Sequence, residues 1–247
     1  MDRNNIDLAD LLLAMIIWYA LIIGFAIIFM KLILIFYSPD NRILYFLSLI
    51  AVAGLPIFFK YYSYLYDFPQ LFLFTLCLLL LVKQKWSFYL IALAFSTLNK
   101  ETSILLILIY FIYYNKKLSK SIFTKLIVSQ IVIYVLLKIV LTITFIDNPG
   151  TFVEFHLLHN VKMEPYTISQ FVAFIIIGMA IIYDWKNKPS FLRLSFSILI
   201  PLSFLTFFFG FFDEYRDYYE IYPVLFLLIT HSVCRIFNAD ILKQRTI

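Results

Sequence analysis

The feature that most constrains this chain is a succession of nine apolar runs separated by short polar stretches. A helix that crosses a bilayer needs about 20 apolar residues, and barrel strands would instead alternate in polarity. These runs do not alternate, so we predict an all-α polytopic transmembrane bundle, one integral membrane domain over residues 1–247. The predicted segments are Leu11–Tyr37, Ile43–Phe59, Phe68–Val82, Trp86–Leu98, Lys100–Tyr114, Ile122–Ile146, Ile168–Tyr183, Phe191–Phe212 and Tyr219–Phe237.

The composition excludes the soluble classes of protein. Of all residues, 63% are hydrophobic and 14% are charged, whereas a soluble domain carries roughly 45–50% apolar and 25% charged residues. A net charge of +5 in a soluble chain would suggest a nucleic acid as partner. Here the basic residues lie in short loops, so we expect membrane lipids as surroundings and no nucleic acid. The first run exceeds the core of a signal peptide, roughly 7–15 residues, so we expect a retained helix.

The loop charges predict an orientation. If the nine segments alternate, one set of loops holds 13 basic and three acidic residues, and the other holds five basic and 12 acidic residues. Because cytoplasmic loops carry an excess of Lys and Arg, the first set is predicted to be cytoplasmic. The N-terminus is then outside and the C-terminus is in the cytoplasm.

Three central segments, the third to the fifth, are too short for the bilayer. Their 13–15 residues extend about 20–22 Å, against a hydrocarbon core of about 30 Å. Lysines pin their cytoplasmic ends, so the deficit falls on the outer side. We predict capping of the third segment by Asp67 with Gln70, and of the fifth by Asn99. Polar backbone at that depth is tolerated where it lines a wet cavity, so we expect an outward-open cavity floored by these helix starts.

Asp67 and Glu101 are the first candidates for general acid–base chemistry in this cavity, with helix capping as the alternative role. Lys100 and Asn99 stand beside them as candidate substrate-binding residues, since a cation and helix N–H groups suit phosphate.

The longest outer loop contains Glu154-Phe155-His156-Leu157-Leu158-His159-Asn160. If this stretch is helical, His156 and Asn160 share a face and Glu154 points elsewhere. The spacing does not gather three metal ligands, so we predict no metal site here. His156 is the reserve proton-transfer group, and Glu154 and Asn160 are candidate substrate ligands. The alternative is an amphipathic interfacial stretch.

A run of acids, tyrosines and one arginine, Asp213–Glu220, precedes the last segment. Arg216 is a candidate for forked phosphate binding, and Glu214 and Glu220 are candidates for holding it or for contacting substrate. A divalent cation bound through their oxygens is one alternative, and an aromatic belt with a solvated acidic rim is the other. No Walker or dinucleotide motif is present, so we expect no resident cofactor.

Several motifs resemble a group of bacterial polytopic membrane proteins. They are Tyr66–Leu76, Lys85-Trp86, Thr97–Thr102, the Glu-x-His loop and the Glu-Tyr-Arg stretch. The layout also resembles the membrane half of GT-C-type glycosyltransferases. That resemblance implies short central helices beneath an outer active site and polyprenyl-phosphate-linked sugars as donors. The first outer loop, Lys60–Tyr66, is shorter than in that family, which leaves room for a partner subunit that supplies missing residues.

The sequence therefore predicts a GT-C-like glycosyltransferase of envelope polysaccharide or glycolipid assembly that acts on a lipid-linked sugar phosphate. Two alternatives stay open: a transporter or flippase for the same lipid-linked substrate, and a scaffold subunit of a membrane complex. A transporter would need polar groups along the path to the other face, and only Ser129, Gln130, Lys138 and His231 offer them.

Overall fold

The computed structural model describes residues 8–38, 41–58, 64–148, 154–162 and 167–237. Within these ranges every regular element is a helix, so the predicted all-α bundle is confirmed. The α-helices are α1 (Leu8–Phe36), α2 (Asn41–Ala53), α3 (Asp67–Val82), α4 (Trp86–Asn99), α5 (Ile104–Tyr114), α6 (Lys120–Thr144), α7 (Leu157–Lys162), α8 (Ile168–Ile182), α9 (Ser190–Ser195), α10 (Leu199–Phe209) and α11 (Tyr222–Ile236). Short 3-10 turns are η1 (Leu55–Phe58), η2 (Glu101–Ser103), η3 (Trp185–Asn187), η4 (Phe196–Ile198) and η5 (Tyr215–Tyr218).

Each of the nine predicted segments corresponds to apolar helix in the described residues. Three helical stretches, Ala9–Phe36, Lys120–Thr144 and Ser190–Phe209, are long and apolar enough to cross a membrane. Six further apolar helices have 10–17 residues. The predicted shortness of the central helices is confirmed, since α3 has 16 residues and α4 has 14. It is not confined to them, because α2 has 13 and both α8 and α11 have 15.

Two predicted segments are broken. The second ends as an α-helix at Ala53, where Gly54 and Pro56 interrupt it, and continues as the turn η1; its predicted last residue, Phe59, lies outside the described residues. The fifth begins as the 3-10 turn η2 after an extended Lys100, whose φ is −153°. A proline cannot donate the helical hydrogen bond, and an extended residue ends the helical path.

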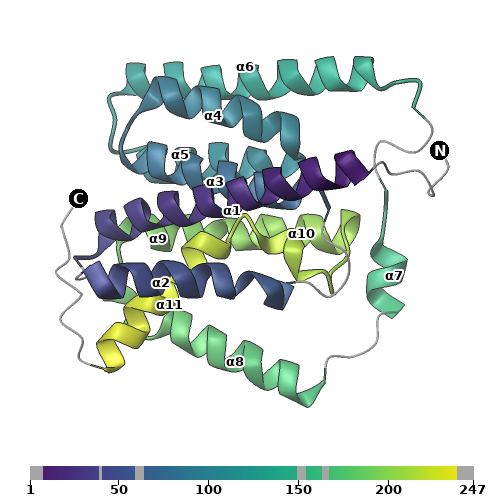
Figure 1. The fold of residues 1–247 in the computed structure, drawn as a ribbon. Helices are drawn as coiled ribbons and strands as arrows, with labels where there is room; N and C mark the ends of the chain where they lie inside the picture. The colour runs from purple at the N-terminus through teal and green to yellow at the C-terminus, as the bar shows by residue number, and fades with distance from the viewer. Residues whose placement is uncertain (1–7, 39–40, 59–63, 149–153, 163–166, 238–247) are drawn as a thin grey trace.

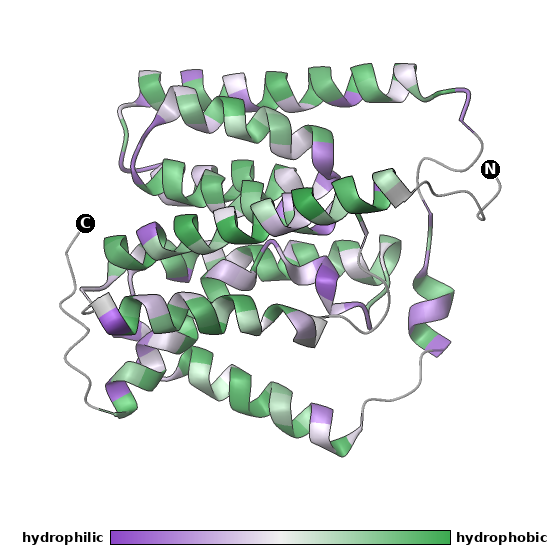
Figure 2. Cartoon of the chain, in the orientation of Figure 1, coloured by the Kyte–Doolittle hydropathy of each residue, from purple (hydrophilic) through white to green (hydrophobic). Residues whose placement is uncertain are grey.

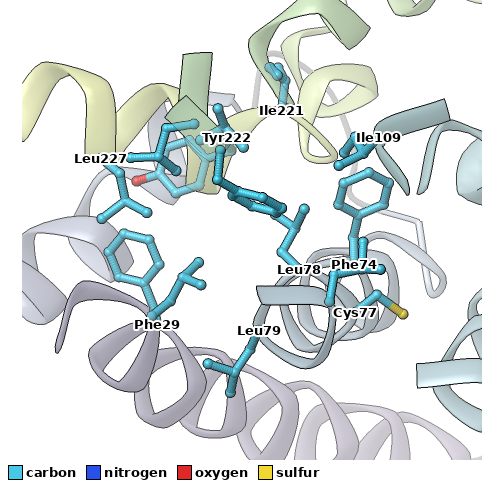
Figure 3. Packing of buried hydrophobic residues seen from close by; sticks show 14 of the residues in the cluster. Phe29, Phe74, Cys77, Leu78, Leu79, Ile109, Ile221, Tyr222 and Leu227 are labelled. Carbon is cyan, nitrogen blue, oxygen red and sulfur yellow. The ribbon is translucent and has the colours of Figure 1, made fainter. Parts of the chain in front are cut away.

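The helices pack mainly side by side. Helices α1, α3, α4 and α6 contact one another in that order, α5 contacts α3 and α6, and α11 contacts α8 and α9 (Figure 1). Residues far apart in the sequence meet in the interior: Phe29 of α1, Phe74 of α3, Ile109 of α5 and Leu227 of α11 belong to one buried cluster (Figure 3). Because the helices themselves are apolar, this close van der Waals packing and interhelical hydrogen bonds hold the bundle together.

The outer helices expose apolar surface. In α6 the one buried residue is Gln130, and in α8 it is Ile181. In Figure 2 both helices are coloured mostly green, the colour of hydrophobic residues, and hydrophilic residues are mainly at helix ends and in loops. A soluble monomer rarely exposes contiguous apolar patches of this extent, whereas lipid-facing helices do.

Candidate functional site

The polar centre of the molecule forms where α3 begins, where α4 ends and where the chain approaches α11. Several of its side chains are buried, although they are charged. Burial of a charge is costly unless the charge is paired, so the pairing has to be accounted for. We call this group the Glu220 cluster; its members are Asp67, Gln70, Asn99, Lys100, Thr102, Glu214, Arg216, Asp217 and Glu220.

Glu220 lies at the centre of the cluster, with a fully buried side chain (0% exposed). Its Oε1 accepts a hydrogen bond from the Thr102 hydroxyl and one from Gln70 Nε2 at 3.4 Å. Lys100 Nζ lies 3.4 Å from the same oxygen. The other oxygen, Oε2, is buried and has no hydrogen-bond partner among the described residues. One oxygen of this carboxylate is therefore fixed by three donors, and the other keeps its lone pairs.

Lys100 links two acidic residues of the same stretch. Its Nζ lies 3.5 Å from Asp217 Oδ1 and 3.4 Å from Glu220 Oε1. Burial alone would lower the pKa of Lys100, but the carboxylates of Glu220, Asp217 and Asp67 outweigh burial and raise the pKa above its ordinary value. The ammonium is therefore charged across the physiological pH range.

Asp217 lies close to the backbone of Gly210, and this close approach is possible because glycine has no side chain. A Cβ added at Gly210 would lie 2.7 Å from Asp217 Oδ2 and 3.3 Å from the Thr206 backbone. A side chain at this position would displace Asp217, so the absence of one at Gly210 is part of how the cluster is assembled.

Arg216 is the buried cation of the cluster, with 5% of its surface exposed. Its guanidinium donates hydrogen bonds to Glu214 Oε2, and Nη1 lies 4.0 Å from Asp67 Oδ2. The guanidinium also lies 3.9 Å from the centre of the Tyr64 ring. Burial lowers the pKa of Arg216, but the bonds to Glu214 more than offset it. For Glu214 the burial effect prevails, and the pKa of this carboxyl is raised despite the Arg216 partner.

The predicted helix caps are wrong. Asp67 is the first residue of α3, and its Oδ2 accepts the Tyr64 backbone N–H at 2.7 Å instead of capping the helix. Gln70 turns to Glu220, and Asn99 donates to the Tyr66 carbonyl and to Gln70 Oε1 at 3.0 and 3.2 Å. These side chains join separate elements to one another, which local spacing along one helix does not reveal.

The two innermost carboxylates of the Glu220 cluster do not face the outward-open cavity that was expected at the start of α3. Asp67 is 1% exposed and Glu220 0%, so neither carboxylate lines an open space. The segment before α11 covers the start of α3 and contributes four cluster members. Lys100 and Asp217 keep 14% and 20% side-chain exposure and form the more accessible part of the cluster.

Glu101 lies outside the cluster, although it follows Lys100 directly. Its side chain is 76% exposed and forms an ion pair of 2.6 Å with Lys138 of α6. The backbone carbonyl of Glu101 accepts a hydrogen bond from Tyr134 at 3.1 Å. Glu101 thus connects η2 to α6, and it does not face the carboxylates of the last stretch.

His156, Glu154 and Asn160 form a separate group around α7 and the end of α10. Glu154 Oε2 lies 3.2 Å from His156 Nε2, and the expectation for a helical stretch, in which Glu154 points elsewhere, does not apply to it. The reason is that the helix begins only at Leu157, which leaves Glu154 outside it. The His156 ring stacks near Phe211, with the ring centres 4.1 Å apart.

Asn160 has a structural role at the end of α10. Its amide donates to the carbonyls of Phe207 and Gly210 at 2.7 and 3.0 Å and accepts the Phe212 N–H at 3.0 Å. The side chain therefore satisfies backbone groups that a helix end leaves unpaired.

Among the described residues, no group of three or more His, Cys, Asp or Glu side chains is arranged to hold a metal ion. The four carboxylates of the Glu220 cluster are instead held by Lys100, Arg216 and neutral donors.

Sequence reasoning missed three members of the cluster. Thr102 and Asp217 were not singled out as ligands, and Gln70 was assigned to a cap. Asp217 was detectable as an acid within the stretch before the last helix. Thr102 and Gln70 carried no such signal, since their role depends on the contact of α3 and η2 with Glu220.

A second polar group lies toward the C-terminal end of α11, away from Glu220. His231 Nε2 is 3.1 Å from Asp184 Oδ2, and Lys188 Nζ donates to the Leu228 carbonyl and the Ser232 hydroxyl at 2.5 and 2.6 Å. Lys188 is 2% exposed, and burial lowers its pKa to about 8. This group connects the end of α8 to α11.

In comparisons with known proteins, no protein-family model, no curated protein and no solved structure matches the chain.

Proposed function

We propose that the chain is an integral protein of the bacterial inner membrane, with its N-terminus outside and its C-terminus in the cytoplasm. In this proposal the Glu220 cluster faces the outer leaflet and belongs to a GT-C-like glycosyltransferase. Its substrate is a sugar linked to polyprenyl phosphate, used in envelope polysaccharide or glycolipid assembly.

One observation carries the proposal: Glu220 is a buried carboxylate with Oε1 held by Thr102, Gln70 and Lys100 and with Oε2 unpartnered. A general base needs a fixed orientation and a free lone pair within reach of the proton that it accepts. Glu220 combines a fixed orientation with a free lone pair, unlike Glu101, which is exposed and paired with Lys138, or His156, which lies beside α10. Because Oε2 is buried, the segment before α11 has to move aside before an acceptor hydroxyl reaches it.

The reaction follows from these positions. Oε2 of Glu220 accepts the proton of an acceptor hydroxyl while that oxygen bonds to the anomeric carbon of the donor sugar. The bond from this carbon to the phosphate oxygen breaks, and polyprenyl phosphate leaves with the electron pair. Arg216 neutralises the leaving phosphate by forked hydrogen bonds, and Asp67 acts as a positioning residue for the guanidinium.

The cations of the cluster are already paired with acids, and this pairing sets a condition on binding. A phosphate has to displace Glu214 from Arg216 before it receives both guanidinium N–H groups. Glu214 is suited to this exchange because its raised pKa favours uptake of a proton as the second anion arrives.

The packing favours an enzyme over a transporter. Each of the four polar groups that a path was expected to use has another bond: Gln130 binds Tyr89, Lys138 binds Glu101, His231 binds Asp184, and Ser129 binds its own helix. Phe29, Phe74, Leu78 and Tyr222 belong to one tightly packed hydrophobic cluster in the interior of the bundle (Figure 3). A scaffold subunit remains the competing class, and it requires no chemistry at Glu220.

The test is turnover of polyprenyl-phosphate-linked hexoses by the purified chain in proteoliposomes, followed by mass spectrometry of free polyprenyl phosphate. Glu220→Gln is expected to lower turnover by at least about a hundredfold, since a positioned base contributes roughly 10²–10⁴-fold. Glu101→Gln is the matched control, and it is expected to retain activity. A wild-type chain that releases no polyprenyl phosphate from any hexose donor would reject the transferase.

A further inference from the structure

The end of the bundle away from the Glu220 cluster carries a strongly basic surface. Two loops form it, the turn between α3 and α4 and the connection between α5 and α6 with the first turns of α6. We call this surface the lysine patch; its members are Lys83, Lys85, Lys116, Lys117, Lys120 and Lys125, and all six are exposed. The two loops lie at the left edge of Figure 2, where they are coloured as hydrophilic.

Within the part of the chain that the structure describes, no acidic side chain pairs with the lysine patch. Glu101 is the only acidic residue between positions 68 and 146, and it pairs with Lys138 of α6. Among the described residues, none of the six lysines forms an ion pair. Clustered exposed cations of this kind attract an anionic surface.

The two loops are fixed to one another. The Tyr114 hydroxyl at the end of α5 donates to the Leu81 carbonyl at the end of α3 at 2.6 Å. The Trp86 ring lies edge-on to Tyr110 and Tyr114, with centroid separations of 5.9 and 5.2 Å. The lysines therefore project from a preorganised base, and Lys117 lies over the Tyr113 ring at 3.6 Å.

Exposed apolar side chains adjoin the lysines within two helical turns. Phe88 of α4 is 66% exposed, Phe111 of α5 46% and Ile122 of α6 47%. A soluble anion would use the ammonium groups and leave this surface uncovered. An anionic phospholipid fits both parts, because its headgroup meets the lysines and its acyl chains cover the apolar side chains.

We propose that the lysine patch is a binding surface for the headgroups of anionic phospholipids in the leaflet that it faces. This inference rests on the membrane insertion stated in the proposed function, but it does not depend on the glycosyl transfer. The bound lipid holds the ends of α3, α4, α5 and α6 at the membrane surface, opposite the Glu220 cluster.

The experiment is native mass spectrometry of the detergent-solubilised full chain with equimolar phosphatidylglycerol and phosphatidylcholine of identical acyl chains. The wild-type chain is expected to retain phosphatidylglycerol at least about tenfold over phosphatidylcholine. The triple variant Lys116→Gln, Lys117→Gln and Lys120→Gln is expected to lose most of this preference. The matched triple arginine variant at the same positions keeps the charge and is expected to retain it.

A second neutral variant, Lys83→Gln with Lys85→Gln, tests the other loop in case the triple variant does not yield folded protein. Equal retention of both lipids by the wild-type chain overturns the proposal, as does an unchanged preference in the neutral variants. Competition by glycerol 3-phosphate as strong as that by the lipid also overturns it, because the acyl chains would then add nothing. Release of the wild-type chain from membranes by alkaline carbonate would contradict the proposed membrane insertion. Absence of a lipid preference alone would overturn the lipid-binding surface and leave the proposed function unaffected.

Discussion

Lys100 Nζ lies 3.4 Å from Oε1 of Glu220, although 119 intervening positions separate these two residues in the chain. The pair joins the end of α4 to the stretch before α11 in a site where Glu220 is fully buried. Removal of one member leaves a buried charge without compensation, which is far more costly than the pair itself is stabilising.

We therefore expect Lys100→Met to lower the stability of the chain by about 3–5 kcal/mol. The double variant with Glu220→Gln is expected to recover part of this loss, because it removes the orphaned charge as well. Thermal unfolding in detergent measures both. Lys138→Met is the matched control: its partner Glu101 is 76% exposed, and such pairs contribute about 0–1 kcal/mol. Equal losses in the two lysine variants would contradict the buried pair.

The approach of Asp217 to Gly210 gives a second prediction. Gly210→Ala places a Cβ 2.7 Å from Asp217 Oδ2, so Asp217 must move away from Lys100, at a cost of about 1–3 kcal/mol. Gly178→Ala in α8 is the control, because a Cβ there meets no atom within 4 Å. Its higher helix propensity is expected to make this variant neutral or more stable by up to about 1 kcal/mol. The measurement is the thermal unfolding of both variants in the same detergent. A Gly210→Ala variant as stable as Gly178→Ala would contradict the close approach of Asp217 to Gly210.

Asn160 is expected to hold α7 against the end of α10. Asn160→Ala removes the donors to the carbonyls of Phe207 and Gly210 and the acceptor of the Phe212 N–H, with a stability loss of about 1–3 kcal/mol. Hydrogen exchange of the backbone at positions 207–212 is expected to accelerate. Asn160→Asp keeps the acceptor and loses the donors, so protection of the Phe212 N–H should survive in that variant. An unchanged exchange rate at positions 207–212 in Asn160→Ala would show that the Asn160 side chain does not hold α7 against the end of α10.

Lys188 gives a prediction about pH. Its pKa is lowered to about 8 by burial, below the ordinary value of about 10.4. The folded chain therefore binds this proton more weakly than the unfolded chain, and the buried charge opposes folding below pH 8. Between about pH 8 and 10.4 the folded state loses the proton first, so the stability contributed at this position rises with pH.

The measurement is the difference in melting temperature between wild type and Lys188→Met across pH 7–11, which removes the titration of other groups from the comparison. The melting temperature of wild type relative to that of the variant is expected to rise above pH 8 and to reach a plateau near pH 10.4. A difference that is flat over this range would show that Lys188 titrates no differently in the folded chain.

The sequence by itself determined the helical class and the approximate bounds of nine apolar helices. This was possible because a long run of apolar residues marks, locally and without knowledge of its partners, a segment that is kept out of water. It also singled out six residues that the structure brings together in the Glu220 cluster, from the starts of short helices or from the acidic run before the last helix: Asp67, Asn99, Lys100, Glu214, Arg216 and Glu220. Local spacing failed where partners lie on different helices, and for that reason Asp67, Gln70 and Asn99 were assigned to caps.

Only the tertiary structure decided which polar residues meet. It separates Glu101 from Lys100 because Lys100 is extended and Glu101 begins the turn η2. The Lys100 side chain reaches the stretch before α11, and the Glu101 side chain reaches α6. It brings Thr102 and Gln70 to one oxygen of Glu220 and leaves the other oxygen unpartnered. Pairing of buried charges is a property of the packed helices, since each charge takes the partner that burial brings within reach, and no single segment of the chain contains that information.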